Sequence, residues 1–448
     1  MRNRKLKPAI ISGNFQKSFK VFIFVSNQPY FSLTSNQYHG TMNEKTKDFL
    51  KFSQKGQLMP QEEMLETGFK KDKLVIGIPK EASQNENRIA LVPEAVHLLV
   101  ENGHRVLLEE YAGAAAHFTN EQYAEAGAEI MATHDEVFTA DYLVKIGPLT
   151  EEELSKMTSN KVLFSSLFLP DRNKAYFEKL MAKKVKAVSY EFIQDKTGAF
   201  PVIKSMSEII GNTAVLIAAE YLSHASYGRG IMLGGFPGIK PTEMVIIGAG
   251  TVAEYAARTA LGMGAFVKIF DNSIYKLRSV QNNLGNRVFT SILQPKVLMK
   301  AMKEADVVIA AKHSDAGVAP CFVSEEMIRQ MRPGSVIVDV SIDQGGCFET
   351  SRATSHEQPV YQVHGITHYC VPNIASRVPH TASYSLSNFL TPLLLNISDA
   401  GGIDRFLKID HAFSKGIYIY NGMMTNKYIS DMFDISFRDL DLLMAAFR

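Results

Sequence analysis

The stretch Met244–Ala253, with the sequence MVIIGAGTVA, decides how the chain folds. An apolar run typical of a strand leads directly into Gly248 and Gly250, and a helix-like pattern follows at once. The next apolar run, FVKIF at 266–270, ends at Asp271. A strand, a glycine turn, a helix and a second strand ending in an acid together predict a βαβ unit that binds a dinucleotide. A tight turn in an ordinary α/β domain would explain the glycines but not the acid.

Each residue of this unit has a physical role in such binding. Gly248 lets the chain turn sharply, and Gly250 lacks the Cβ that would keep a pyrophosphate away from the backbone. The start of the helix offers free N–H groups and the positive end of its dipole. Asp271 is placed to accept hydrogen bonds from a ribose diol, which favours NAD over NADP. Ala253 stands at the third glycine position, where a small side chain allows close packing of helix and strand.

The composition narrows the class of protein. With 448 residues, 46% of them hydrophobic, the chain can fill the cores of two domains. A net charge of +2 gives no reason to expect nucleic-acid or membrane-surface binding. The cysteines Cys321, Cys347 and Cys370 have no metal-ligand spacing, which argues against a disulfide framework or a metal site and suits a cytoplasmic protein. No apolar run approaches the roughly 20 residues of a membrane span.

The first part of the chain differs from the rest. Residues 1–72 are polar and irregular, apart from the short apolar run 21–25. Two interpretations stand: a misassigned start, with Met42 as the natural initiator, or a poorly ordered extension or targeting arm. We prefer the misassigned start.

From Lys73 onwards strand and helix patterns alternate, which predicts parallel sheets. We expect an α/β fold of two doubly wound parallel-sheet domains, joined by long helices and separated by a cleft. The substrate domain comprises 73–203 and 380–448, and the nucleotide-binding domain comprises 204–379. The last segment is expected to be mainly helical. The expected strands begin near residues 74, 105, 142, 162, 186, 244, 266, 306 and 335, and the longest expected helices cover 207–223 and 381–397.

Several polar residues fall where the expected strands end. Asp343 follows a buried strand and is the better catalytic candidate, whereas Asp339 lies inside the apolar run and reads as a structural acid. Arg88 follows the first strand, and it either grips a substrate carboxylate or forms a salt bridge with Glu81 or Glu86. His380 lies near the second domain crossing, where a structural or solvated role is the more common one for a lone histidine.

From Lys73 to Arg448 the chain resembles the alanine dehydrogenase family, whose other branch is the NAD-binding component of transhydrogenase. The resemblance depends on ordered motifs that span most of the chain: GIPKE at 77–81, NRIA at 87–90, Tyr190-Glu191, MSE at 206–208, GGFPG at 234–238, IGAG at 247–250, DQGGCFE at 343–349, and Asn373 with Val378-Pro379. The DQGGCFE form is similar to the alanine dehydrogenase branch.

The resemblance implies a cytoplasmic oxidoreductase of amino-acid catabolism that converts L-alanine, NAD and water to pyruvate, ammonia and NADH. It implies a homo-oligomer, often a hexamer. Arg88 would hold the substrate carboxylate, and Asp343 would stand beside the reacting carbon. The residues that would contact NAD are Ser207, Gly248, Ala249, Gly250, Val252, Asp271, Lys276, Val340, Ile342, Arg352, Val371, Asn373 and Ile374.

Two positions depart from the family. Its catalytic lysine aligns with Gly147, leaving only Lys145 nearby, and its catalytic histidine aligns with Phe168. General acid–base groups contribute roughly 100- to 10,000-fold in rate, so these changes bear directly on turnover. Two hypotheses follow: an amino-acid dehydrogenase whose protons move through Lys145 or His380, or a relative that binds NAD and does other work. The second covers a transhydrogenase-like carrier, another amino or oxo acid, and a non-catalytic subunit.

Overall fold

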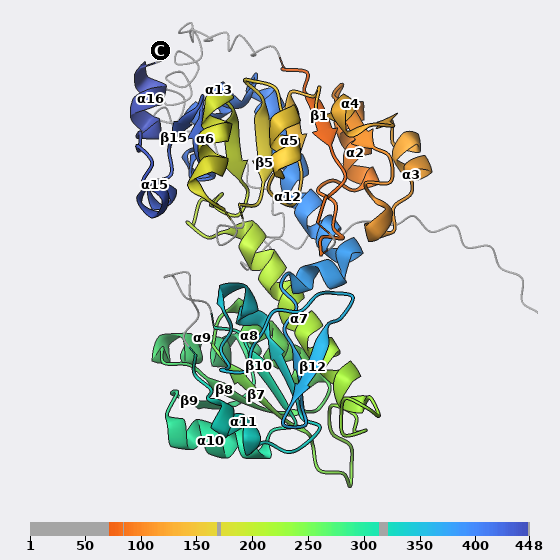
Figure 1. The fold of residues 1–448 in the computed structure, drawn as a ribbon, viewed down its shortest axis with the longest axis vertical. Coiled ribbons are helices and arrows are strands. Elements are labelled where there is room, and N and C mark those ends of the chain that lie inside the picture. Colours follow the sequence, from red (N-terminus) through yellow and green to blue (C-terminus); the bar gives the residue numbers. More distant parts are fainter. Residues whose placement is uncertain (1–70, 84, 168–171, 313–320, 447–448) are drawn as a thin grey trace, which may run out of the picture. The chain divides into compact units, whose positions relative to one another are not determined.

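The computed structural model describes residues 71–446, except for 84, 168–171 and 313–320. The interpretations of residues 1–70, including Met42, therefore lie outside the described residues. Two sheets organise the described chain (Figure 1). Both are predominantly parallel and carry helices on their faces, which confirms the predicted α/β class.

The first sheet has the strand order β15-β14-β6-β5-β4-β1-β2-β3. Its strands are β1 (Val75–Ile78), β2 (Arg105–Glu109), β3 (Glu129–Met131), β4 (Tyr142–Val144), β5 (Val162–Ser165), β6 (Lys186–Ser189), β14 (Ile417–Tyr420) and β15 (Met423–Met424). The accompanying helices are α2 (Pro93–Glu101), α3 (Asn120–Glu125), α4 (His134–Val137), α5 (Glu151–Lys156), α6 (Lys174–Ala182), α12 (Pro379–Asp399), α13 (Ile403–Ile409), α14 (His411–Ser414), α15 (Lys427–Phe433) and α16 (Leu440–Ala446), with a short 3-10 turn at Ala114–Ala116.

The second sheet has the order β12-β13-β11-β10-β7-β8-β9. Its strands are β7 (Glu243–Ile247), β8 (Phe266–Phe270), β9 (Phe289–Ser291), β10 (Val307–Ala310), β11 (Val336–Asp339), β12 (Val360–Val363) and β13 (Ile366–Tyr369). Its helices are α7 (Pro201–Ser223), α8 (Thr251–Gly262), α9 (Ile274–Leu284), α10 (Pro295–Glu304) and α11 (Glu325–Arg329), with 3-10 turns η3 (Val340–Gln344) and η4 (Ile374–Arg377). From β7 the strand order runs outward in both directions, as in dinucleotide-binding sheets.

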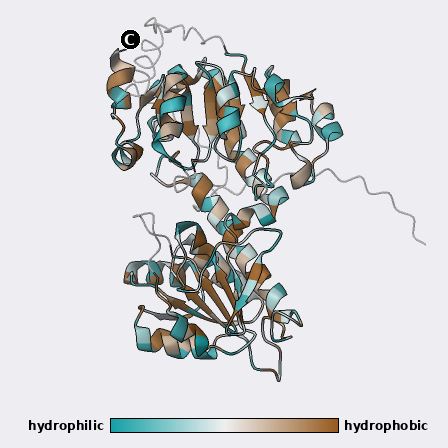
Figure 2. Cartoon of the chain, in the orientation of Figure 1, coloured by the Kyte–Doolittle hydropathy of each residue, from teal (hydrophilic) through white to brown (hydrophobic). Residues whose placement is uncertain are grey.

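Side chains of the central strands of the second sheet point alternately to its two faces, so the hydrophobic core around this sheet has two layers. Met244 and Ile246 of β7 pack with residues of α7, α8 and α9, whereas Val245 and Ile247 pack with residues of α10 and α11. Successive side chains of a strand point to opposite faces, so a strand covered on both faces is apolar throughout. Figure 2 shows the result, with hydrophobic strands inside and hydrophilic residues on the helices.

Each sheet adds antiparallel strands to its parallel core. Antiparallel pairs join β12 to β13 and β14 to both β6 and β15, so neither sheet is wholly parallel. The final segment also contributes strands to the first sheet rather than helices alone. Both new hairpins have two-residue turns with positive φ, at His364-Gly365 and at Asn421-Gly422. Such turns match the twist of paired strands.

The long helix α7 begins at Pro201, six residues before the expected start. By length and composition alone, it is the one helix of the described residues that could cross a membrane. Its buried side, which includes Ala214 and Ala218, packs in the core of the second sheet. The helix therefore serves as a core element.

Helix starts in the first part of the chain follow local side-chain chemistry. The threonine before each of α3, α4 and α5 accepts a hydrogen bond from the backbone three residues on, and the side chain there returns one. Such capping boxes satisfy backbone N–H groups that no helical bond can reach. In α5 the pair is Thr150 and Glu153.

Gly211 of α7 lies against α8, which yields a test of the packing. A Cβ at Gly211 would lie 2.5 Å from Val252 O and 2.8 Å from Tyr255 Cβ. We expect Gly211→Ala to lower the free energy of unfolding by about 1–3 kcal/mol, because overpacking outweighs the gain in helix propensity. The matched control is Gly262→Ala in α8, whose new methyl would have no atom within 4 Å. Urea denaturation that ranks Gly211→Ala at or above the control would contradict this packing.

Candidate active site

The turn after β7 is held open by glycine geometry. Gly248 has φ of +113°, and a Cβ there would lie 2.4 Å from Ala311 O in the segment after β10. The next amide, Ala249 N–H, donates to Asp271 Oδ2 at 3.0 Å. The turn is therefore fixed on one side by the end of β10 and on the other by the end of β8.

Gly250 offers the space and the donors that a phosphate needs. It is the N-cap of α8 and makes no side-chain capping bond, and a Cβ built there would meet no atom within 4 Å. A cavity of about 360 Å³ adjoins it, lined by Ala249, Gly250, Thr251 and Lys276 together with other residues of α7, α8 and α9, among them Glu208 and Glu254. Backbone N–H groups, a helix dipole and a lysine suit a pyrophosphate. These residues therefore fit a dinucleotide.

Asp271 lies at the end of β8 as the sequence predicted, but it has a partner that the sequence reasoning missed. Its carboxylate is 1% exposed and accepts hydrogen bonds from the amides of Ala249 and Ser273. Lys312 Nζ, from the segment after β10, lies 3.0 Å from both carboxylate oxygens. The acid expected to hold the ribose is thus already paired with a cation.

The other residues expected to contact NAD lie on several elements around the second sheet, and their contact with NAD stays a prediction. Arg352 places its guanidinium 4.2 Å from the centre of the Tyr361 ring. The remaining positions are Ser207 on α7, Val252 in the first turn of α8, Lys276 in the first turn of α9, Val340 and Ile342 in η3, Val371 after β13, and Asn373 and Ile374 at the start of η4.

The two acids near the end of β11 have different surroundings. Asp339 is fully buried and accepts hydrogen bonds from Ser341 N, Cys347 N and Ser351 Oγ. This agrees with the structural role predicted for it, and burial raises the pKa of its carboxyl. Asp343 lies four residues on, in η3, and is exposed. Its expected catalytic role stays a prediction.

Arg88 forms the salt bridge that was one of its two interpretations. Its Nε and one terminal nitrogen donate to the two oxygens of Glu86, at 2.7 and 2.6 Å, and the other terminal nitrogen lies 3.6 Å from Met206 Sδ. The pair is not on the surface, since the Arg88 side chain is 13% exposed. A guanidinium has five N–H donors. The contacts described here use three, so a substrate carboxylate could still be bound by the remaining two.

The segment 85–88 contacts the segment that begins η4. Asn373 Nδ2 donates to Glu86 Oε2 at 2.8 Å and to Asn85 O at 3.2 Å. Asn87 N donates to Ser376 Oγ at 2.7 Å. The residue expected to hold the substrate and a residue expected to hold the coenzyme thus share one partner, Glu86.

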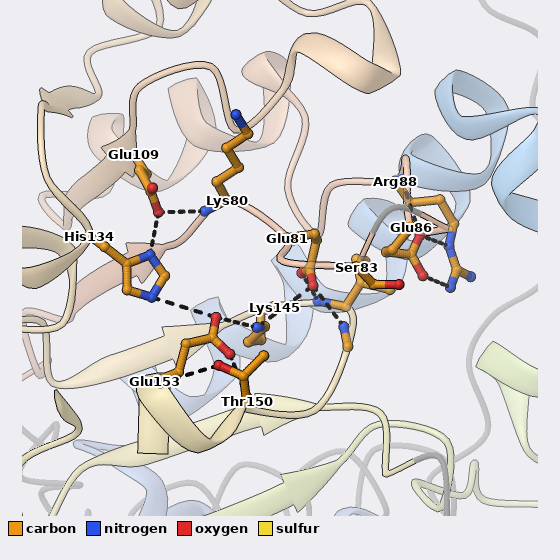
Figure 3. Close-up of polar contacts among 12 residues, drawn as sticks. Lys80, Glu81, Ser83, Glu86, Arg88, Glu109, His134, Lys145, Thr150 and Glu153 are labelled. Atoms are coloured by element: carbon orange, nitrogen blue, oxygen red, sulfur yellow. Dashed lines mark hydrogen bonds and ion pairs between the residues drawn. The ribbon is translucent and has the colours of Figure 1, made fainter. Parts of the chain in front are cut away.

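Lys145 lies in a buried network of charges (Figure 3). Its ammonium group is 1% exposed, donates to Glu153 Oε1 at 2.6 Å and lies 3.8 Å from Glu81 Oε2. Glu153 lies 3.5 Å from His134, which in turn contacts Glu109 at 2.7 Å. Burial alone would raise the pKa of Glu109, but hydrogen bonds from His134 and from the Lys80 amide lower it overall. Lys145 is therefore paired with buried carboxylates, and its catalytic role stays a prediction.

Glu81 faces Gly147, the position that is expected to align with the family's lysine. Its carboxylate accepts hydrogen bonds from the amides of Ile146 and Gly147, and a Cβ on Gly147 would lie 3.2 Å from Glu81 Oε2. Burial raises the pKa of Glu81 to about 7, against the opposing effect of Lys145. A carboxyl group with this pKa can accept or release a proton near neutral pH.

Further polar groups gather at the ends of β4 and β6. Tyr190 donates its hydroxyl hydrogen to Ile146 O at 2.6 Å, and Glu191 accepts a hydrogen bond from Leu167 N at 3.2 Å. Burial raises the pKa of Glu191. Phe168, the second expected departure from the family, lies outside the described residues. The sequence reasoning missed Glu81 and Glu191 as functional candidates, although both end motifs that follow strands.

His380 has a local structural environment. Its Nδ1 lies 3.0 Å from Ala116 O, and its ring stacks on Phe118 with centroids 4.5 Å apart. This supports the structural interpretation of His380 rather than a role in proton transfer.

The strand order of the second sheet, its glycine turn and the acid after β8 define a dinucleotide-binding α/β protein. Comparison with known sequences specifies it further. The patterns of "Alanine dehydrogenase/PNT, N-terminal domain" and "Alanine dehydrogenase/PNT, C-terminal domain" match residues 77–210 and 214–427. The chain belongs to the alanine dehydrogenase/PNT family, and it is an NAD-dependent oxidoreductase.

Individual relatives agree with this assignment. The chain is 37% identical over 369 residues to an alanine dehydrogenase of Staphylococcus saprophyticus, covering 82% of this chain and 99% of that protein. It is also 37% identical over 373 residues to an alanine dehydrogenase of Mycolicibacterium smegmatis, covering 83% and 100%. A solved L-alanine dehydrogenase superposes with a TM-score of 0.75 at 36% identity, covering 80% of this chain and 98% of that one. A transhydrogenase from Sinorhizobium meliloti shares the fold, with a TM-score of 0.67 at 24% identity over 79% and 99%.

The open space at Gly250 generates a prediction that separates binding from folding. We expect Gly250→Ala to leave the melting temperature unchanged, because the new methyl meets no protein atom. The same methyl would occupy the phosphate position and weaken NADH binding about tenfold, or about 1.4 kcal/mol. Fluorescence titration with NADH measures this, with Gly262→Ala as the control. Unchanged NADH affinity in Gly250→Ala would place the pyrophosphate elsewhere.

Proposed function

We propose that this chain is an alanine dehydrogenase: it oxidises L-alanine with NAD and water to pyruvate, ammonia and NADH, and runs in reverse. The observation that carries the proposal is the shared contact at Glu86. Glu86 binds Arg88, the expected anchor of the substrate carboxylate, and Asn373, an expected NAD contact. A substrate held at Arg88 would therefore lie beside the coenzyme.

Each residue has a role in this reaction. Arg88 orients the substrate by its carboxylate, and orientation of this kind supplies a large part of enzymatic rate enhancement. NAD, when bound, accepts the hydride that leaves the α-carbon. Asp343, in η3 four residues beyond β11, would stand beside the reacting carbon. The resulting imino acid adds water and releases ammonia, a step that needs a group to accept and return protons.

We assign that proton transfer to Glu81 rather than to Lys145 or His380. Lys145 is fixed between two carboxylates, and His380 is bonded to Ala116 O. Glu81 borders the space that Gly147 leaves where the family has a lysine, and its pKa is about 7. The groups that act on its charge are Lys145, Glu86 and the amides of Ile146 and Gly147.

A second candidate function follows from the same departure. Replacing a lysine by Gly147 removes a proton carrier, which favours a relative that binds NAD but acts on another amino or oxo acid, carries hydride as transhydrogenases do, or has no alanine turnover. The coenzyme site would be the same under either function.

Assembly and location are part of the proposal. We infer a cytoplasmic homo-oligomer, a hexamer by analogy with the family, with a small amino or oxo acid as its substrate and no nucleic-acid partner. The three cysteines are free thiols, as in a reducing compartment. The exposed side chains of Met232, Phe236 and Ile239 support a contact between subunits.

The direct test is a steady-state screen of amino acids with NAD and of oxo acids plus ammonia with NADH. We expect L-alanine and pyruvate to be the preferred substrates.

We also expect Phe168→His combined with Gly147→Lys to raise alanine turnover roughly 100- to 10,000-fold, because it restores acid–base groups. NADH binding without turnover in either protein would favour the second function.

The pH profile tests Glu81. Alanine oxidation needs its carboxylate form, so kcat/KM should rise with pH up to about 7 and then level off. In Glu81→Gln this inflection should disappear and kcat should fall roughly 100-fold or more. The control is Glu101→Gln, on the exposed side of α2. A merely structural Glu81 would lower the melting temperature of its variant while leaving the inflection near pH 7 in place.

A further inference from the structure

Lys312 changes the charge at the adenosine end of the coenzyme site. Its ammonium group lies 3.0 Å from each oxygen of Asp271, and the side chain is 19% exposed. An acid at the end of the second strand normally selects NAD because it binds the ribose hydroxyls and repels a 2′-phosphate. In this chain the acid is neutralised by a cation at hydrogen-bond distance.

The position of Lys312 is fixed by the backbone around it. Strands β10 and β8 lie on either side of β7, and Lys312 follows β10 as Asp271 follows β8. The Lys312 amide donates to Ser341 Oγ at 3.0 Å, and its nitrogen would lie 3.2 Å from a Cβ on Gly248. Because Gly248 has no side chain, the lysine can reach across the end of β7 to Asp271.

The remaining contacts of Asp271 are with backbone amides. Oδ1 accepts a hydrogen bond from Ser273 N at 2.8 Å, and Oδ2 accepts one from Ala249 N at 3.0 Å. These amides hold the carboxylate from the protein side, so a ribose 2′ substituent that reaches Asp271 also meets Lys312. Lysine is a strong point-charge partner for phosphate.

We propose that Lys312 lets this site accept a 2′-phosphorylated dinucleotide, NADP or NADPH, in addition to NAD and NADH. The proposal rests on the proposed coenzyme site, and it makes Lys312 the residue that sets the selectivity. The ammonium group supplies the charge that a 2′-phosphate needs, and the paired Asp271 no longer presents an uncompensated negative charge that would repel one.

The test compares binding of NADH and NADPH by calorimetry to the wild type, to Lys312→Met and to the control Lys296→Met, an exposed lysine of α10. Methionine keeps the length of the side chain and removes its charge. We expect the wild type to bind NADPH within about tenfold of NADH. In Lys312→Met, NADPH affinity should fall at least about tenfold, while NADH affinity stays the same or rises. Lys296→Met should match the wild type.

Adenosine 2′,5′-bisphosphate and ADP serve as second probes. Both are AMP with one additional phosphate, which the bisphosphate carries on the ribose 2′ oxygen and ADP carries on its 5′-phosphate. The bisphosphate should lose affinity in Lys312→Met, and ADP should not. The proposal is overturned if the wild type binds NADPH about 100-fold more weakly than NADH. It is also overturned if Lys312→Met lowers the affinity for both coenzymes equally. Failure to bind NADH at all would instead refute the coenzyme site itself.

Discussion

The close approach of Gly248 to the end of β10 is the constraint on which the coenzyme site depends. Only a residue without a side chain fits there, since a Cβ would lie 2.4 Å from Ala311 O. This contact fixes the glycine turn and places Lys312 within hydrogen-bond distance of Asp271. The turn leads directly into α8, which begins beside the open space at Gly250. The selectivity of the site is therefore set by backbone packing as much as by the acid.

In the first sheet too, neighbouring strand ends bring charged side chains close together. Glu81 follows β1, Lys145 follows β4 and Glu191 follows β6, and these strands are close neighbours in one parallel sheet. Few of these charges face water, so each depends on a neighbour. Lys145 is balanced by Glu153, whereas Glu81 keeps a raised pKa because burial outweighs its partners.

Local patterns in the sequence predicted much of this structure, and pairing over distance accounts for the rest. The glycine turn, Asp271 and the parallel core strands follow from periodicity and motif. The hairpin at Asn421-Gly422 had a recognisable turn signal that the helical interpretation of the last segment overlooked. The pairing of Lys312 with Asp271, 41 residues apart, has no sequence signature, because it depends on β10 and β8 flanking β7. The pairing of Arg88 with Glu86 rather than Glu81 likewise depends on which side chains are buried together, and a short stretch of sequence does not show this.

Glu153 joins two tasks that are usually separate. Its Oε2 accepts a hydrogen bond from the Thr150 amide and so completes the cap that begins α5, while its Oε1 holds the buried ammonium of Lys145. Neither partner can change alone without stranding an amide or a cation in the interior. Positions 145, 150 and 153 are therefore coupled in the structure, and a change at one of them alters the surroundings of the other two.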